Sequence, residues 1–396
     1  MSLIARRLAA HKPPWRDNDT LGTTIQIDGE PLTGVVNGHT VVLAGTNNYL
    51  GLTFHPDCIR AANEAAIHYG TGTTGSRVAN GTYPAHAQLE EELRDFYGAR
   101  SAMVFTTGYQ ANLGIISGIA DRDSMILLDA ESHASIYDGA TLSGAQTYRF
   151  KHNDPADLDK KLGRLGNGAG NALVITEGIY SMLGDTAPLK EICEVCKAHD
   201  AGLILDEAHS FGVLGATGRG LAEREGVEDM IDIIIGTFSK SLGCVGGYAV
   251  SRTHDLDSLR VVARSYVFSA SATPSVVASA RAALAVLRAN PGLKEQLLDH
   301  AKRVYAALDQ LGFVVGPEIS PVVGVVIKEA ETTLEAWRFL LNRGVYVNLV
   351  APPGSPGNYC LLRCSLSAAH TNDQIGTIIE GFQSLAESGI LAADMR

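Results

Sequence analysis

The sequence has no apolar run of the ~18 residues that a membrane-spanning helix requires, no basic cluster and no secretory signal. Its 32 lysines and arginines are outnumbered by 43 aspartates and glutamates, which gives a formal net charge of −11. An acidic chain without a basic patch is a poor ligand for phosphate backbones, so we expect no nucleic-acid partner. With 396 residues, 45% of them hydrophobic, the chain can form a large core and more than one domain.

Cysteine is scarce, and its spacing does not favour disulfides or metal. Cys193 and Cys196 form a CxxC, but LKEICEVCKAHD has the pattern of an amphipathic helix and no second ligand pair accompanies it. We therefore interpret them as two ordinary helical thiols and predict no metal site. Cys360 and Cys364 lie in a predicted strand as small apolar residues. A reducing cytoplasm is the expected compartment.

Short apolar runs alternate with helical patterns from residue 101 onward. The runs SAMVFTTG, SMILLDA, NALVITEG, AGLILDEA, MIDIIIGTFSK and GGYAVSR read as buried strands, with helices after the first three of them. Strands that are apolar throughout indicate a mostly parallel sheet covered by helices on both faces. We predict an α/β fold with a large domain over 46–285 and a smaller α+β domain over 286–396. Residues 1–45 are expected to form an N-terminal arm and short strands.

The stretch HYGTGTTGSR contains a literal G-x-G-x-x-G at Gly70, Gly72 and Gly75. A dinucleotide-binding fingerprint follows a strand and opens a helix. Here a predicted helix, 55–70, precedes it, and the next helix begins only near Pro84. A phosphate P-loop is also excluded, because Arg77 follows Ser76 where Lys-Ser/Thr is needed. We therefore expect a connecting loop, which forms either a neutral linker or one wall of a site built elsewhere.

Two later strands end in residues that suit one cofactor. Asp206 ends the strand of LDEAHS, and Lys240 follows the next strand in GTFSKSLG, with the hydroxyls of Thr237 and Ser239 beside it. An amine can hold the aldehyde of pyridoxal 5′-phosphate (PLP), a carboxylate can pair with its ring nitrogen, and hydroxyl and backbone donors can bind its phosphate. The alternative is that Lys240 is an ordinary lysine in an exposed loop. The presence of Asp206 after one strand and of Lys240 with hydroxyls after the next argues against it.

Over nearly its whole length the chain resembles the α-oxoamine synthases, fold-type I PLP enzymes that condense an amino acid with an acyl thioester and release CO2. The motifs that carry the resemblance are NNYLG, GTTGSRVANGT, HAQLEEELRDFYG, TGYQANLG, DAESHASIYDG, EGIYSMLGDTAPL, LDEAHSFGVLG, GTFSKSLGCVGG, FSASATPS and LLRCSLSAAHT. Within the family the resemblance is strongest to the bacterial serine palmitoyltransferases. It implies L-serine and palmitoyl-CoA as substrates, and 3-ketodihydrosphingosine, CoA and CO2 as products of a sphingolipid pathway.

The resemblance also implies roles for individual residues. Lys240 would form the Schiff base and move the α-proton, and Asp206 would hold the proton on the pyridine nitrogen. His133 would stack on the ring and contact the substrate carboxylate, and His209 would bond the phenolic oxygen. The remaining expected contacts are Gly108, Tyr109, Thr237 and Ser239 to the phosphate, Ser271 and Thr273 to the phosphate of a neighbouring subunit, and Arg363 with Asn48 to the amino-acid carboxylate. Glu177 also ends a predicted strand, and a site residue and a simple strand-end cap are equally consistent with its position.

One position departs from the pattern. In YVNLVAPPGSPG, Ala351 stands where the serine palmitoyltransferases have the arginine of Arg-Pro-Pro. A sister enzyme that uses glycine or alanine, or an acyl carrier protein thioester, is therefore the alternative. A non-catalytic partner subunit and a dehydrogenase are more distant hypotheses.

The resemblance implies a homodimer with shared active sites. The basic amphipathic N-terminus MSLIARRLAAHKPPW is expected to be a packing arm, with peripheral contact to a membrane surface as the second interpretation.

Overall fold

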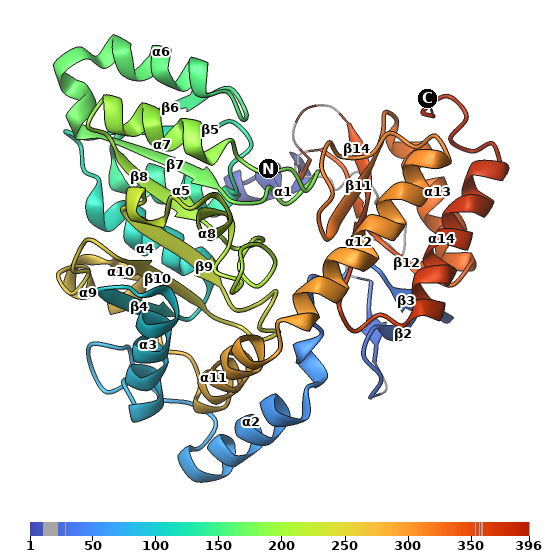
Figure 1. Ribbon diagram of the computed structural model, residues 1–396, viewed down its shortest axis with the longest axis horizontal. Coiled ribbons are helices and arrows are strands. Elements are labelled where there is room, and N and C mark those ends of the chain that lie inside the picture. The colour runs from blue at the N-terminus through green and yellow to red at the C-terminus, as the bar shows by residue number, and fades with distance from the viewer. Residues whose placement is uncertain (11–22, 28, 353, 356, 358, 396) are drawn as a thin grey trace.

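A seven-stranded sheet forms the centre of the larger lobe in the computed structural model, which describes residues 1–10, 23–27, 29–352, 354, 355, 357 and 359–395 (Figure 1). The strand order is β4-β10-β9-β8-β7-β5-β6, and only β10 runs antiparallel to its neighbours. This confirms the mostly parallel sheet. The strands are β4 (Ser101–Phe105), β5 (Met125–Asp129), β6 (Gln146–Phe150), β7 (Ala172–Glu177), β8 (Gly202–Asp206), β9 (Ile233–Thr237) and β10 (Gly247–Ser251).

Helices bury both faces of this sheet, which explains why its strands are apolar throughout. In β5, Ile126 and Leu128 belong to one hydrophobic cluster and Leu127 belongs to the other. The first cluster includes α4 (Gly108–Ile119) and α5 (Ala134–Ser143). The second includes α3 (Pro84–Tyr97), α6 (Pro155–Leu165) and α7 (Leu189–Ala198). Short helices complete the lobe: α8 (Leu221–Glu225), α9 (Leu259–Val262) and α10 (Arg264–Val267).

The smaller lobe contains two sheets and three long helices. Antiparallel strands β11 (Val322–Ile327), β14 (Cys360–Ser365) and β13 (Asn348–Val350) form one sheet, beside α12 (Gly292–Gln310), α13 (Ala330–Asn342) and α14 (Asn372–Glu387). The other has the order β1-β2-β3-β12, with β1 (Ile25–Gln26), β2 (Thr33–Val36), β3 (His39–Leu43) and β12 (Val345–Tyr346). Because β12 pairs with β3, the N-terminal strands lie with the C-terminal residues (Figure 1).

Helices α2 (Pro56–Tyr69) and α11 (Pro274–Ala289) pack together below the two lobes in Figure 1. Gly70 ends α2 with a φ of 79°, and α3 begins only at Pro84. The G-x-G-x-x-G segment therefore connects two helices, as the sequence predicts, and it lacks the strand that a dinucleotide fingerprint follows.

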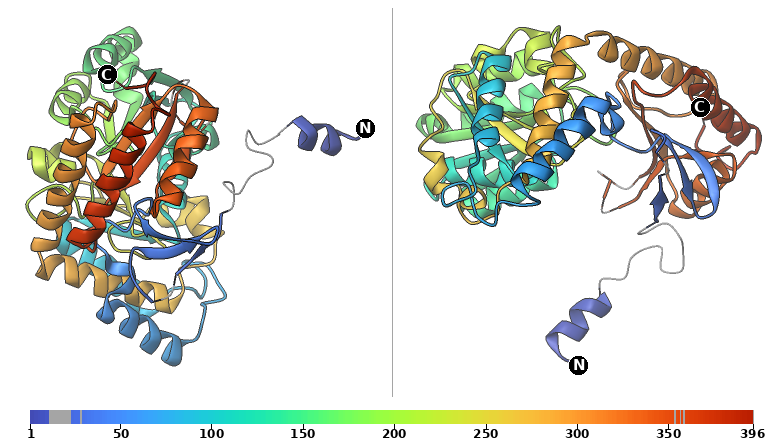
Figure 2. Two further views of the ribbon diagram at one scale, coloured as in Figure 1. Left: turned by 90° about the vertical axis from the view of Figure 1, so that its right-hand side faces the viewer. Right: turned by 90° about the horizontal axis from the view of Figure 1, so that it is seen from below.

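The CxxC lies on α7, where Cys193 and Cys196 are both buried and unpaired, so the helical interpretation is confirmed. Helix α1 (Leu3–Ala10) has no buried residue and stands apart from the lobes (Figure 2). Residues 11–22 of the predicted N-terminal arm lie outside the described residues. Nowhere in the described parts of the chain is a helix both long and apolar enough to span a bilayer.

Candidate active site

A cavity of about 250 Å³ opens where β7, β8 and β9 end. These parallel strands end together at one edge of the sheet, in Glu177, Asp206 and Thr237, and Lys240 follows in the next turn. Eight of the predicted site residues line the cavity: Gly108, Tyr109, His133, Asp206, His209, Thr237, Ser239 and Lys240. Residues from four separate motifs of the sequence therefore meet at one place.

The side chain of Lys240 is partly buried in this cavity. Burial lowers its pKa to about 8, although the nearby charges of Asp206 and Glu177 act in the opposite direction. At pH 7 roughly a tenth of such amines are neutral, compared with about one in 3,000 for an ordinary lysine. The site therefore supplies a nucleophilic amine at neutral pH, as a Schiff-base lysine requires.

Asp206 is held in place by two contacts. Its Oδ1 accepts the backbone N–H of Ala208 at 2.8 Å, and its Oδ2 accepts the side-chain amide of Asn112 at 2.7 Å. Asn112 lies one turn into α4 and also donates to Ser135 Oγ at 2.9 Å. The carboxylate is thus fixed at the bottom of the cavity, where it can face a protonated ring nitrogen.

His133 caps the N-terminus of α5 and is anchored through its backbone to Glu177. Its Nδ1 lies 2.7 Å from Ser135 Oγ, and its N–H donates to Glu177 Oε1 at 2.5 Å. Burial lowers the pKa of His133, and burial together with Asp206 raises that of Glu177 well above its ordinary value. Glu177, which the sequence left undecided, therefore lines the cavity as a buried carboxyl group whose pKa is raised.

His209 belongs to a buried relay that the sequence did not reveal. Its Nδ1 lies 2.7 Å from the hydroxyl of Tyr49, the tyrosine of NNYLG. Burial holds His209 neutral, because it lowers the pKa well below 6.5, and burial raises the pKa of Tyr49 to about 12 despite the nearby Arg363. Both groups are thus uncharged, and when the phenol donates to Nδ1 the imidazole proton lies on Nε2, where it can donate to a ligand oxygen.

The N-terminus of α4 presents backbone N–H donors to the cavity. Amides in the first turn of a helix have no intrahelical acceptor, and Gly108 and Tyr109 line the cavity at this point. Thr237 donates its hydroxyl proton to the carbonyl of Gly246, so Ser239, 2.9 Å from it, keeps the freer hydroxyl. A Cβ on Gly108 would come within 2.8 Å of Thr237 Cβ, which explains why a residue without a side chain stands at this position.

The donor set fits PLP. The cavity combines a partly neutral lysine amine, a fixed carboxylate, a neutral imidazole donor and a helix N-terminus with hydroxyls, and each group corresponds to one functional group of the cofactor. The turn from β4 to α4 contains Gly108 but lacks the G-x-G-x-x-G spacing of a dinucleotide fingerprint.

The four other predicted contacts do not line the cavity. Arg363 is buried at its margin and contacts Asn47 Oδ1 at 3.1 Å and Ser365 Oγ at 2.6 Å. Asn48 instead donates to Thr53 Oγ1 at 2.7 Å, so Asn47 is the amide of NNYLG that touches Arg363.

Ser271 and Thr273 lie in the segment that precedes α11. Ser271 hydrogen-bonds to Thr73 Oγ1 and to the carbonyl of Gly81, both at 2.7 Å, and so holds the glycine loop. Thr273 caps α11. Their contact with a neighbouring subunit stays a prediction.

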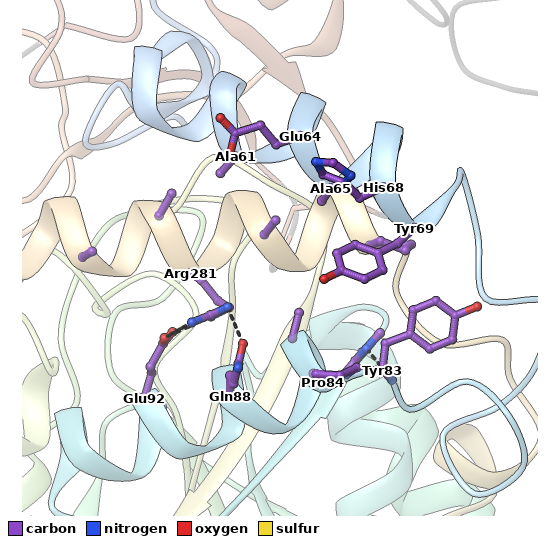
Figure 3. A pocket seen from close by; sticks show the side chains of 16 residues that line it. Ala61, Glu64, Ala65, His68, Tyr69, Tyr83, Pro84, Gln88, Glu92 and Arg281 are labelled. Atoms are coloured by element: carbon purple, nitrogen blue, oxygen red, sulfur yellow. Dashed lines mark hydrogen bonds and ion pairs between the residues drawn. The ribbon is translucent and has the colours of Figure 1, made fainter.

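A larger cavity, of about 550 Å³, lies between α2, α3 and α11 (Figure 3). Figure 3 shows Arg281 already paired with Glu92 and Gln88, by bonds of 2.6 and 2.7 Å. None of the predicted catalytic or cofactor-binding residues lines it. The smaller cavity, which holds the reactive groups, is therefore the candidate active site, although the other cavity is larger.

Comparisons with known proteins agree with this chemistry. The family model "Aminotransferase class I and II" matches residues 39–382. A serine palmitoyltransferase of Caulobacter vibrioides is 52% identical over 89% of this chain and 87% of the relative, and one of Sphingomonas paucimobilis is 47% identical over 89% and 84%. An 8-amino-7-oxononanoate synthase of Trichlorobacter lovleyi is 40% identical over 90% and 92%.

Solved structures agree in fold. A serine palmitoyltransferase from S. paucimobilis with a bound PLP–myriocin aldimine superposes with a TM-score of 0.94, at 43% identity, over 98% of this chain and 99% of that one. The chain described here therefore has the fold-type I arrangement of a large and a small lobe.

Proposed function

The chain belongs to the class I and II aminotransferase family of PLP-dependent enzymes, and we propose that it is a serine palmitoyltransferase of the α-oxoamine synthase type. It condenses L-serine with palmitoyl-CoA and yields 3-ketodihydrosphingosine, CoA and CO2. The observation that carries the proposal is the convergence of Lys240, Asp206, His133 and His209 on one cavity at the N-terminus of α4. The choice of L-serine and palmitoyl-CoA as substrates rests on the similarity to the serine palmitoyltransferases.

PLP supplies an electron sink for the negative charge that forms at the substrate α-carbon. Lys240, with its pKa of about 8, takes the α-proton and later returns one. Asp206, held by Asn112, would keep the pyridine nitrogen protonated. Gly108, Tyr109, Thr237 and Ser239 would retain the phosphate, and His209 would donate from Nε2 to the phenolic oxygen.

The substrate carboxylate is oriented by His133 and Arg363. Arg363 donates its Nε to the carbonyl of Ser181 and its Nη1 to Asn47 and Ser365. A guanidinium fixed on several sides can present a planar fork to a carboxylate. Orientation of this carboxylate matters because the bond that breaks on loss of CO2 must be aligned with the electron sink.

The direct test is product analysis. The PLP-loaded protein is incubated with L-serine and palmitoyl-CoA, and the mixture is analysed by mass spectrometry for 3-ketodihydrosphingosine while free thiol is measured. We expect both to form together. Rapid thiol release with glycine or alanine, and none with serine, would reject serine as the substrate.

A sister activity with another amino acid or thioester is the second candidate, and Ala351 favours it. Ala351 follows β13, whose Val350 pairs with Leu361 on the strand that carries Arg363. No arginine can assist Arg363 from this position. A panel of serine, glycine and alanine against palmitoyl-CoA and acyl carrier protein thioesters, run on the wild type and on Ala351→Arg, separates the two candidates. If the variant shifts preference toward serine, position 351 sets the choice of amino acid.

A homodimer is part of the proposal. Apolar side chains stand exposed on both sides of β10. Val245 precedes the strand and lines the cavity, and Val261, Val262 and Phe268, which is 75% exposed, lie between β10 and α11. Such a group of exposed apolar residues is typical of a protein interface. Light scattering should give about twice the chain mass of 41.9 kDa. A fully active monomer would contradict a shared site.

We place the enzyme in the cytoplasm, where its six cysteines, all free in the structure, would stay reduced. Helix α1 exposes Leu3, Ile4 and Leu8 and carries Arg6 and Arg7. We expect it to pack against the second subunit rather than to bind lipid, since eight residues bury little area in a bilayer. Sedimentation with anionic vesicles tests this: co-sedimentation that is lost when residues 1–10 are removed would instead assign α1 to a membrane surface.

A further inference from the structure

A histidine outside the cavity lies between two carboxylates. His152, in the turn after β6, has Nδ1 2.8 Å from Asp129 Oδ1 and Nε2 2.7 Å from Asp185 Oδ2. Glu131 Oε2 lies 3.8 Å from the same Nε2, and the edge of the imidazole meets the ring of Tyr180 at 4.5 Å. His152 does not line the PLP cavity, so it contacts neither the cofactor nor the reacting atoms.

The geometry fixes the charge of this ring. Ionised carboxylates only accept hydrogen bonds, and a neutral imidazole has a single N–H, so bonds to Asp129 and Asp185 at the same time require the imidazolium. Burial by itself lowers the pKa of His152, but the hydrogen bonds and charges of the two aspartates outweigh it and raise the pKa to about 10. The other titratable groups around the cluster include Glu131, Tyr137, Glu177, Tyr180 and Tyr359.

Asp129 connects His152 to the turn that carries His133. Its carboxylate also accepts the backbone N–H of Glu131 at 2.8 Å and that of Asn153 at 2.9 Å. The turn from β5 to His133 is therefore folded around this one carboxylate. This turn ends at His133, whose backbone N–H donates to Glu177.

Asp185 connects His152 to the loop that supports Arg363. Its Oδ2 also accepts the amide of Asn153 at 2.8 Å, and its carbonyl accepts the N–H of Tyr180 at 2.9 Å, which closes the 180–185 loop. The carbonyl of Ser181 in this loop is the acceptor for Arg363 Nε. The two segments that His152 joins thus hold the two groups assigned to the substrate carboxylate.

We propose that His152, as an imidazolium, is a positioning residue that fixes the turn carrying His133 relative to the loop supporting Arg363, and so sets the geometry of amino-acid binding. The inference rests on the proposed function for the role of His133 and Arg363, whereas the charge of His152 does not depend on it. Loss of the cation leaves Asp129 and Asp185 joined only by neutral donors, among them the backbone N–H and side-chain amide of Asn153, so the repulsion of the two carboxylates is no longer offset and the two segments separate.

The first test measures the protonation of His152 and needs no substrate. In protein labelled with ¹⁵N-histidine, the His152 signals are assigned by their loss in His152→Gln. We expect both ring nitrogens to carry protons at pH 8. A neutral ring at that pH would overturn the proposal whatever the enzyme catalyses.

The second test separates positioning from folding. His152→Gln should weaken amino-acid binding roughly 10- to 100-fold, measured as the concentration of amino acid that shifts the absorbance of the bound cofactor, while PLP affinity changes less than about twofold. His254→Gln is the matched control, since His254 forms a 2.8 Å bond to Asp232 at the exposed edge of the sheet. Equal losses of PLP and amino-acid affinity would assign His152 a structural role only.

A pH profile provides the third arm and covers the case in which His152→Gln folds poorly. Asp185→Asn removes one of the two carboxylates, so the pKa of His152 falls and the cation is lost as pH rises within the working range. The kcat/KM for the amino acid should then gain a new alkaline limb, and this limb should be absent from His152→Gln/Asp185→Asn. An unchanged profile in Asp185→Asn would contradict the proposal. If serine is not the substrate, the amino acid that the panel identifies is used.

Discussion

Replacing Tyr49 with phenylalanine tests the relay that orients His209. The substitution keeps the buried ring and removes only the hydroxyl that lies 2.7 Å from Nδ1. Without this donor, Nδ1 has to carry the imidazole proton or stay unsatisfied, so Nε2 loses the N–H that is assigned to the cofactor.

The size of the effect follows from burial. Both side chains are at most about 5% exposed, so water cannot replace the lost partner. A buried polar group left without its hydrogen bond costs about 1–3 kcal/mol, which corresponds to roughly a 5- to 150-fold change in an equilibrium or rate constant. We expect the loss mainly in PLP affinity and in kcat, because His209 is assigned to the cofactor.

The assay is titration of the apoprotein with PLP, followed by steady-state kinetics. Tyr305→Phe is the matched control, because it removes a hydroxyl that donates to the carbonyl of Gly316 at 2.8 Å in the small lobe. Tyr305→Phe should leave PLP affinity unchanged. If Tyr49→Phe also binds PLP and turns over within about twofold of the wild type, the relay does not orient His209.

Three further predictions concern charge and backbone. Folding lowers the pKa of Lys240 from 10.5 to about 8, so the unfolded apoprotein binds more protons than the folded one between these pH values. In urea titrations, the free energy of unfolding of the wild type, relative to that of Lys240→Met, should therefore rise by about 3 kcal/mol from pH 8 to pH 10.5. If the difference between the two proteins stays constant over this range, the pKa is not lowered. Arg77→Met removes one of the two guanidinium partners of the buried Glu90 carboxylate and leaves Arg260 at 3.2 Å. It should cost about 1–3 kcal/mol in the same assay, whereas no measurable loss would refute a stabilising ion pair. The methyl group of Gly72→Ala meets no atom within 4 Å, so this substitution should change the free energy of unfolding by no more than about 0.5 kcal/mol. The methyl group of Gly75→Ala would lie 1.8 Å from Asn80, so this substitution should lower the free energy of unfolding by about 1–3 kcal/mol in melting experiments. Equal effects of the two substitutions would refute the packing described for this loop.

The sheet and the residues at its edge could be predicted from the sequence because they share a strong local signal. Each central strand is an apolar run that ends in a polar residue, and parallel strands bring those ends together. Asp206 and Lys240 were found in this way. Strand β6 and helix α6 were missed, because β6 is an edge strand with only Phe150 buried and so has no apolar run to recognise.

The supporting residues could not be found from local patterns. Tyr49 lies 160 positions from His209, and Asn112 lies 94 positions from Asp206, so nothing in the sequence near either member marks the contact. Asn47 and Asn48 are adjacent, and only the backbone turn of NNYLG decides which amide faces Arg363. The N-terminal strands join the small lobe through β12, a two-residue strand too short for the sequence to reveal.

The central claim is that Lys240 carries the cofactor. After reconstitution with PLP and reduction with borohydride, peptide mass spectrometry locates the stable pyridoxyl group. We expect one modified peptide, GTFSKSLG with the label on Lys240, and no label in Lys240→Ala. A label on another lysine, or none on a folded protein saturated with PLP, would contradict the assignment of the active site.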